Sequence, residues 1–377
     1  MLLRRWFAAV AVVFATLGAL PSAAQRRPDA TRQRADAFTV SSVPVDATAA
    51  NATAARDLAI AGGEQRAFKL LMDRLTQPND SARVPKATLA QLNDLVQGFE
   101  VANEHRSGVR YLADYTFHFR PEAVRQFLRQ AGIAFAETPS KPLVVLPVLN
   151  ADGRSVLWDD PNPWREAWAN AKLAPGLVPL TRPLGELEDI QAIDADAAAQ
   201  GDDAGLRAIS KRYDDADVLV TQATLKTDSA QHVVDVTSTR YTLGVAGVEQ
   251  TWVSSTLAGP GESDGDTLSR AVAATLAQVE AAWRAANTLD ASQSGTLLAR
   301  VPAASLQEWV AVRDRLSGIP AVRSSRLLAL DREGARIELR FIGDPKQLRL
   351  ALAQRDLELS GEDPDWVLRR AGAAAPR

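Results

Sequence analysis

The sequence contains no cysteine. This absence excludes disulfide bonds, zinc–thiolate sites, iron–sulfur clusters and cysteine nucleophiles. It also leaves no residue to carry the lipid anchor of a bacterial lipoprotein. Histidine is scarce, with three in the whole chain, and none lies in an HExxH string. We therefore predict structural roles for His105, His118 and His232, and no metal site.

Catalytic and nucleotide-binding signatures are missing as well. The chain has no Walker phosphate loop, no dinucleotide-binding glycine fingerprint, no GxSxG elbow and no Ser-x-x-Lys pair. We therefore expect no cofactor and assign no catalytic residue. The formal net charge is −3, so no broad basic surface is predicted and nucleic acid is not an expected partner.

A long apolar run is present only at the N-terminus. Arg4 and Arg5 precede the run Trp6–Leu20, and small residues follow up to Ala24. This order predicts a secretory signal peptide over residues 1–24, cleaved after Ala24. The alternative is an uncleaved anchor helix, although the run is shorter than the ~20 residues that span a bilayer. The mature protein is then expected in the periplasm, without a transmembrane segment.

The periodicity of the rest predicts an α/β protein (α+β mixed), with two ferredoxin-like split β-α-β units flanking a mixed α/β domain. The expected organisation is a disordered leader (25–36), an N-terminal domain (37–138), a central domain (139–290), a C-terminal domain (291–363) and a tail (364–377).

The two outer domains share one order of elements. In the first, a strand over 38–45, a helix over 54–75, a hairpin turning at 106–108 and a helix from Pro121 are predicted, with 133–135 as a last strand. In the second, the corresponding segments are a strand (296–301), a helix from Pro302, a hairpin (322–330 and 336–342), a helix from Pro345 and a closing strand (357–359).

The central domain has a different pattern. The continuous apolar run at 143–149 predicts a strand buried on both faces, and 218–224 predicts a second. Segments 233–241 and 247–257 alternate, which favours antiparallel strands. Apolar residues from Leu268 to Trp283 follow helical spacing, which predicts a long amphipathic helix.

Several strings carry a family resemblance. They are FTVSSVPVDATAANATAARDLAIAGGEQRAFKLLMDRLT, RYLADYTFHFRPEAVRQFLRQAGIAFAE, LVVLPVL and LWDDPNPWREAW, in that order. Over roughly residues 37 to 290 the chain resembles the bacterial family DUF2066, a domain of unknown function. The resemblance implies an exported Gram-negative protein and brings no activity, substrate or catalytic residue.

Two fold-level similarities are more distant. The central domain is similar in pattern to the N-terminal domain of TolB and to the curli secretion lipoprotein. The first domain is similar in pattern to the N-terminal domain of a periplasmic flagellar assembly protein. Such similarities imply an envelope protein and supply no mechanism.

The strongest local motif runs from Leu157 to Trp168 (LWDDPNPWREAW). Trp is enriched at binding hot spots, so one hypothesis is a contact surface for an envelope protein. The alternative is that the tryptophans pack on the sheet while Asp160 and Asn162 cap a helix that starts at Pro163. A third is catalysis by Asp159 or Asp160. The residues of the hypothetical contact surface are Trp158, Asp159, Asp160, Asn162, Trp164 and Trp168.

Two other acidic groups are interpreted as ordinary turns. One contains Asp214, Asp215 and Asp217, and the other contains Glu262, Asp264 and Asp266. Neither has the spacing of a calcium-binding loop. The function expected from the sequence is a non-enzymatic binding or assembly factor of the cell envelope. A hydrolase or transferase with an acidic site is one alternative, and a scaffold that oligomerises through the helix near Trp283 is another.

Overall fold

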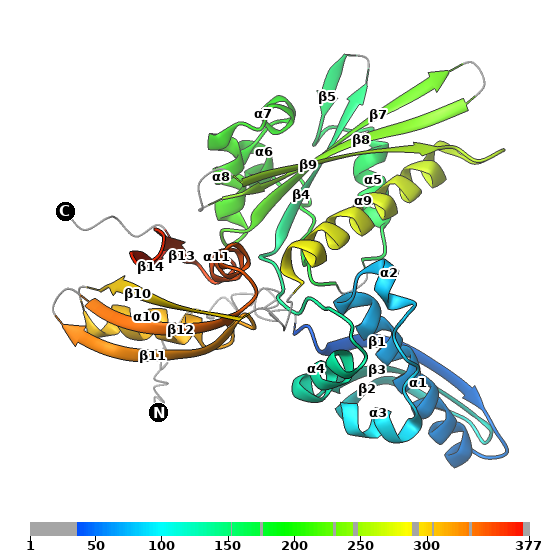
Figure 1. Cartoon of the computed structure of the whole chain (residues 1–377). Coiled ribbons are helices and arrows are strands. Elements are labelled where there is room, and N and C mark those ends of the chain that lie inside the picture. Colours follow the sequence, from blue (N-terminus) through cyan, green and yellow to red (C-terminus); the bar gives the residue numbers. More distant parts are fainter. Residues whose placement is uncertain are drawn as a thin grey trace, which may run out of the picture. The chain divides into compact units, whose positions relative to one another are not determined.

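The computed structural model describes residues 36–151, 153–173, 176–228, 231–243, 248–288, 294–303, 305–331 and 334–371. The predicted signal peptide and nearly all of the predicted leader lie outside these residues. The strands form three sheets, and helices alternate with them along the chain. The predicted mixed α and β class is therefore confirmed (Figure 1). Within the described residues, no helix combines the length and apolarity that crossing a bilayer requires.

The first sheet has the order β1-β3-β2, all antiparallel. The elements are β1 (Thr39–Thr48), α1 (Ala52–Leu75), α2 (Pro78–Ser81), α3 (Leu89–Leu95), β2 (Val96–Arg106), β3 (Arg110–Phe119) and α4 (Pro121–Gln130). Because β3 lies between β1 and β2, this is a split β-α-β unit, as predicted. Residues 133–135 do not add the predicted last strand to this sheet.

Helix α1 packs closely on the first sheet at Gly63. Gly63 is buried, and a Cβ at this position would lie 3.0 Å from Val45 Cγ1 and 3.1 Å from Phe117 Cζ. The glycine that weakens the helix by its low propensity thus lets the helix approach the sheet. The stripe on α1 differs from the prediction in its first half, since Leu58 is exposed and Ala55 and Ala59 are buried.

The central sheet has the order β5-β4-β7-β8-β9, with β6 pairing β4 off this path. Its elements are β4 (Leu143–Ala151), β5 (Arg154–Val156), α5 (Pro163–Asn170), β6 (Leu180–Thr181), α6 (Leu187–Ala192), α7 (Ala195–Gln200), α8 (Asp203–Arg212), β7 (Asp217–Asp228), β8 (Gln231–Thr242), β9 (Val248–Leu257) and α9 (Asp264–Asn287). Strands β4 and β7 are parallel, and β8 and β9 extend the sheet antiparallel, as predicted.

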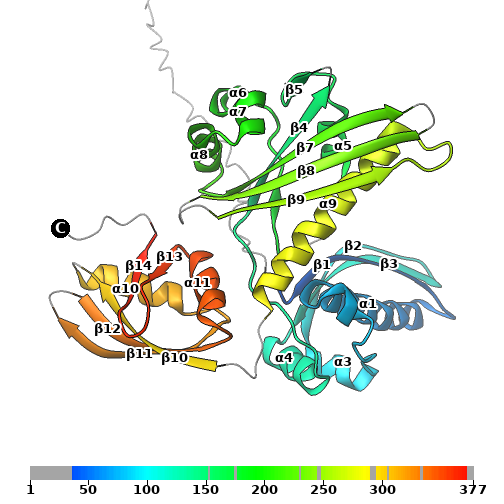
Figure 2. The same ribbon diagram turned by 45° about the horizontal axis from the view of Figure 1, so that its top comes forward.

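Strand β4 is buried on both faces, which confirms the interpretation of its apolar run. Leu143 and Val145 join the core that contains α5 and α9. Val144 and Leu146 join the core that contains α7 and α8. Figure 2 shows α9 along one face of the sheet and α6, α7 and α8 on the other. Successive side chains of β4 point to opposite faces of the sheet, so this one strand contributes to the hydrophobic cores on both faces.

The third sheet has the order β11-β12-β10-β14-β13. Its elements are β10 (Ser294–Pro302), α10 (Leu306–Leu316), β11 (Val322–Asp331), β12 (Gly334–Ile342), α11 (Pro345–Ala353), β13 (Leu357–Ser360) and β14 (Trp366–Arg370). Because β12 lies between β10 and β11, this domain also contains a split β-α-β unit.

The predicted tail is corrected by the structure. Residues Trp366–Arg370 form β14, which pairs parallel with β10 and antiparallel with β13. Trp366 and Leu368 are buried in the core of this domain. The pattern of five residues was too short to separate a strand from a polar terminus by periodicity alone.

Candidate functional site

The loop before α5 is held by Asn162, which is fully buried. Its Oδ1 accepts a hydrogen bond from the Arg165 backbone N–H (2.9 Å), and its Nδ2 donates to the carbonyls of Val156 (3.1 Å) and Leu157 (3.2 Å). Asn162 therefore caps the helix and ties it back to the chain after β5, as the capping alternative predicted. Pro163 occupies the first turn, where its missing N–H costs nothing.

The next two tryptophans belong to the core. Trp164 is 0% exposed and Trp168 is 1% exposed, and their rings meet edge-on with centroids 5.9 Å apart. The Trp164 Nε1 donates to the Thr221 carbonyl (3.0 Å) and Oγ1 (3.2 Å). The hypothesis of a contact surface is therefore wrong for Trp164, Trp168 and Asn162, because four-residue spacing directed both rings inward onto the sheet.

The two aspartates of the motif lie at the surface. Asp159 and Asp160 are both exposed, and Asp160 Oδ1 forms an ion pair with Arg165 Nη2 (2.6 Å). Asp160 therefore does not cap α5 as one alternative proposed. An exposed carboxylate beside a guanidinium lacks the desolvation that general acid catalysis requires.

Trp158 connects this loop to a segment that the sequence analysis left unassigned. Its ring is half-buried, and its Nε1 donates to the Ile193 carbonyl (2.7 Å) just after α6. Gly185, before α6, approaches the same ring, and a Cβ there would lie 3.2 Å from Trp158 Cε3. With a φ of +78°, Gly185 also adopts a backbone conformation that favours glycine.

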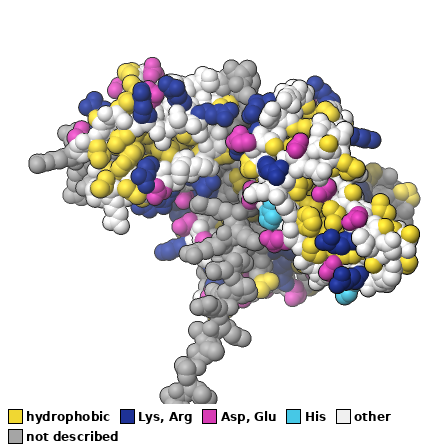
Figure 3. Space-filling model, turned by 90° about the horizontal axis from the view of Figure 1, so that it is seen from below, with side chains coloured by type: hydrophobic (Ala, Val, Ile, Leu, Met, Phe, Trp, Pro, Cys, Tyr) yellow, Lys and Arg dark blue, Asp and Glu magenta, His cyan; other side chains and the backbone are white. Residues whose placement is uncertain are grey.

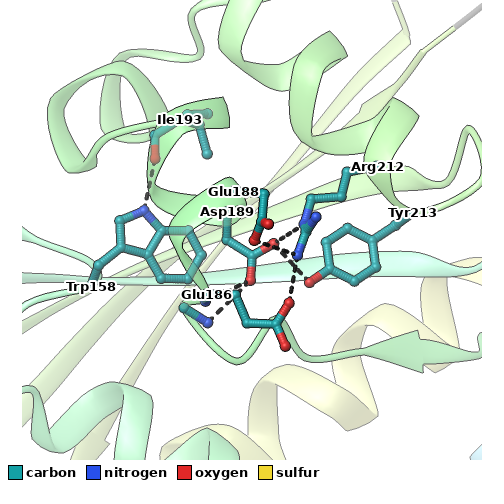
Figure 4. Close-up of polar contacts among 8 residues, drawn as sticks. Trp158, Glu186, Glu188, Asp189, Ile193, Arg212 and Tyr213 are labelled. Carbon is teal, nitrogen blue, oxygen red and sulfur yellow. Dashed lines mark hydrogen bonds and ion pairs between the residues drawn. The ribbon is translucent and has the colours of Figure 1, made fainter. Parts of the chain in front are cut away.

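Helix α6 is anchored by a charged residue, shown in Figure 4. Asp189 is 0% exposed. Its Oδ1 accepts from Arg212 Nε (2.5 Å) and from the Tyr213 hydroxyl (3.0 Å), and its Oδ2 accepts from the N–H groups of Gly185 and Glu186 (3.1 Å each). Four donors thus satisfy one buried carboxylate, as burial of a charge requires.

Two further acids surround the same guanidinium. Arg212 Nη2 contacts Glu186 Oε2 (2.7 Å) and Glu188 Oε2 (3.5 Å). Burial and the hydrogen bond to Asp189 raise the pKa of Tyr213 to about 12. Three carboxylates against one guanidinium leave this group with a formal charge of −2. The buried Asp189 joins α6 to Arg212 and Tyr213 at the end of α8.

The apolar side chains of α6 and its leading loop face outward. Leu184 is 81% exposed, Leu187 is 65% exposed and Ile190 is 45% exposed. This helix therefore buries its carboxylate and exposes its aliphatic residues, the reverse of an ordinary amphipathic helix. We call these three residues, with Glu186 and Glu188, the α6 surface. Their three-residue spacing resembles a buried stripe, so the sequence alone would have placed them in the core.

The remaining acidic groups are engaged in structure. Asp217 and Arg240 form a buried ion pair (2.6 Å), and burial raises the pKa of Asp217. Asp214 and Asp215 both have φ values near +56° and form the turn before β7. Glu262 pairs with Arg270 (2.6 Å). Among the described residues, no group of three acids or histidines is placed to hold a metal ion.

No family model and no curated protein matches the chain. Among solved structures, the lipoprotein GNA1162 from Neisseria meningitidis is similar at 17% sequence identity and a TM-score of 0.24, over 37% of this chain and 97% of that one. A TM-score this low supports no statement about function, so the site stands on its own geometry.

Proposed function

We propose that this protein is a binding or assembly factor of the cell envelope that docks a protein partner on the α6 surface. The observation that carries the proposal is the inversion of α6, which buries Asp189 and exposes Leu184, Leu187 and Ile190. A buried charge and an exposed apolar cluster are the informative exceptions to ordinary burial.

The energetics favour a partner that covers these side chains. Burial of a large aliphatic side chain stabilises by about 1.5–3 kcal/mol, and three such side chains lie within one short segment. The network around Asp189 holds the segment in place before binding, which lowers the entropy lost on docking. A small group of exposed aliphatic side chains of this kind fits a concave apolar pocket on the partner.

The charges around these side chains specify the partner further. Glu186 and Glu188 flank Leu187, and the group they form with Asp189 and Arg212 carries a formal charge of −2. We therefore propose a partner whose apolar pocket is bordered by Lys or Arg. Complementary charge at the border of an interface mainly sets specificity and association rate.

The proposed compartment is the periplasm, and DUF2066 is the proposed family. Arg4, Arg5 and the apolar run that follows support export. The absence of cysteine is compatible with an oxidising compartment, since no thiol is available for unwanted pairing. The strings that resemble DUF2066 support the family, which is itself exported.

The two alternatives receive less support. For an acidic hydrolase or transferase, Asp159 and Asp160 are exposed rather than gathered in a pocket. For a scaffold that oligomerises through α9, Trp283 is 4% exposed and its Nε1 donates to the Thr138 carbonyl (2.7 Å). That face of the helix is occupied within the chain.

A photo-crosslinking experiment tests the proposal. A photoreactive amino acid is placed at Leu187 in the cells that produce the protein, and at Leu306 as a control of matched exposure (65% and 66%) in another domain. We expect one discrete adduct at Leu187 and none of that mass at Leu306. The adduct should disappear when Leu184→Ser and Ile190→Ser are combined with the label.

The captured partner is then purified and its affinity is measured. We expect Leu187→Ser to weaken binding at least tenfold, equivalent to about 1.4 kcal/mol. The same adduct from both label positions would overturn the proposal. An unchanged affinity of the Leu187→Ser variant would overturn it as well.

A further inference from the structure

Among the described residues, helices cover the sheet of the C-terminal domain on one face only. Along β10, Leu297, Ala299 and Val301 are buried in the core that contains α10 and α11, whereas Leu298 and Arg300 are exposed. The same alternation continues in β12. We call the uncovered side the open face. Its exposed residues come from neighbouring strands and are therefore held in a fixed array.

Arginine dominates the open face. Arg300 on β10 lies directly opposite Arg336 on β12 in the antiparallel register. Like charges directly opposite one another destabilise a sheet. Neither arginine forms an ion pair with any described residue, although Arg326 and Arg340 both contact Glu338 (2.9 and 3.3 Å). Strands β10, β11 and β12 together carry five arginines against two acids, Asp331 and Glu338, which leaves an excess of positive charge across them.

The outermost strands do not offset this excess. Arg369 on β14 lies opposite Glu358 on β13, so these two charges cancel. The chain as a whole is negative, with a formal charge of −3. The Debye length is about 8 Å at physiological ionic strength, so the local arginines decide what the open face attracts. An anionic ligand would relieve the repulsion between Arg300 and Arg336.

Exposed leucines lie among these arginines. Leu298 is 54% exposed between Thr296 and Arg300, and Leu328, at the bulge of β11, is 48% exposed. Figure 3 shows this part of the chain, at the left of the view, with hydrophobic side chains beside Lys and Arg side chains. The two aromatic residues of this sheet, Phe341 and Trp366, are buried, so the open face offers no ring on which a base of single-stranded nucleic acid would stack.

We propose that the open face docks on an anionic membrane surface. Arg300, Arg336 and Arg340 would contact lipid phosphates, since guanidinium groups match phosphate oxygens in geometry. Leu298 would enter the headgroup region, where apolar contact adds to electrostatic attraction. This surface lies in a different domain from α6, so the proposal does not depend on the proposed function.

Vesicle binding tests the charge contribution. The protein, in the form that the producing cells accumulate, is sedimented with vesicles of phosphatidylcholine alone or mixed with phosphatidylglycerol. We expect binding to the mixed vesicles that weakens with added salt. Each Arg near a membrane surface contributes about 1 kcal/mol. The combined variant R300Q, R336Q and R340Q should therefore lower the partition coefficient about 100-fold.

The control removes the same charge elsewhere. Arg56 and Arg66 on α1 and Arg313 on α10 are exposed and lie outside the open face. Their combined change to Gln should lower the partition coefficient much less. An equal loss in both variants would overturn the proposal. Equal binding to both kinds of vesicle, or binding to an acidic protein with none to vesicles, would also overturn it.

A second measurement does not depend on arginine variants. Because the chain has no cysteine, Leu298→Cys can carry one polarity-sensitive dye, with Leu306→Cys on α10 as the control. We expect a blue shift for the dye at position 298 with the mixed vesicles and none at position 306. No shift at position 298, or equal shifts at both, would contradict docking through the open face.

Discussion

Helices α5 and α6 belong to one domain and use their apolar residues in opposite ways. In α5, Trp164 and Trp168 are buried, and a neutral polar residue, Asn162, caps the first turn. In α6, a carboxylate is the buried anchor while Leu187 and Ile190 face outward. The comparison teaches that apolar spacing identifies a helix face, whereas the anchor of the helix decides whether that face is buried.

Removal of the core anchor of α5 should have the largest effect. Trp164→Ala deletes a fully buried ring and leaves a cavity beside Trp168 and Thr221, so we expect a loss of about 3–5 kcal/mol in the free energy of unfolding. Chemical denaturation measures this. Trp164→Phe serves as the control and should lose less. If Trp164→Ala lowered the free energy of unfolding by less than Leu187→Ser does, the assignment of α5 to the core would be contradicted.

Removal of the anchor of α6 should have the next largest effect. Asp189→Ala removes the acceptor of four donors, namely the Arg212 Nε–H, the Tyr213 hydroxyl and the backbone N–H groups of Gly185 and Glu186. We expect a loss of about 2–3 kcal/mol, the cost of unsatisfied partly buried donors. Thermal denaturation measures it, with Asp159→Ala as the exposed control. Equal melting temperatures for the two variants would show that Asp189 does not anchor the helix.

The pH dependence of the same anchor is a smaller effect. The pKa of Tyr213 is raised from 10 to about 12, so its contribution to stability is present below pH 10 and is lost as the pH rises towards 12. Tyr213→Phe should cost about 1 kcal/mol at neutral pH, the net value of one hydrogen bond. The difference between wild type and variant should narrow above pH 10. A constant difference up to pH 12 would exclude the contact with Asp189.

The smallest effect on stability is expected at the α6 surface. Leu187→Ser alters an exposed side chain, and we expect a change within about 0.5 kcal/mol. The same variant should weaken partner binding, as described above. A large loss of stability would mean that Leu187 belongs to the core, and the contrast between the two helices would then disappear.

Much of the fold was predictable because it follows from local pattern. The run at 143–149 is continuous and apolar, and β4 is buried on both faces. The predicted helix from Pro163 begins there as α5, capped by Asn162. Strand β14 was missed because its five residues carry little periodicity. The α6 surface was missed because Leu184, Leu187 and Ile190 have the spacing of a buried stripe.

The candidate site was predictable only in part. The motif around Trp158 was identified, and Trp158 does contact the α6 region through the Ile193 carbonyl. The rest depends on Asp189 and Arg212, which are 23 residues apart. No local pattern indicates that these two side chains meet. Their contact is what turns the Asp189 side of α6 inward and leaves Leu187 and Ile190 exposed.

The amino-acid sequence by itself determined the types of the longer elements, the Asn162 cap of α5 and the absence of cysteine chemistry, since each depends on neighbours within a few residues or on composition alone. Tertiary structure alone decided which apolar faces stay exposed. Burial depends on which distant element arrives to cover a face, and on whether a carboxylate such as Asp189 finds four donors there. The α6 surface and the open face both result from such contacts between distant elements, or from their absence among the described residues.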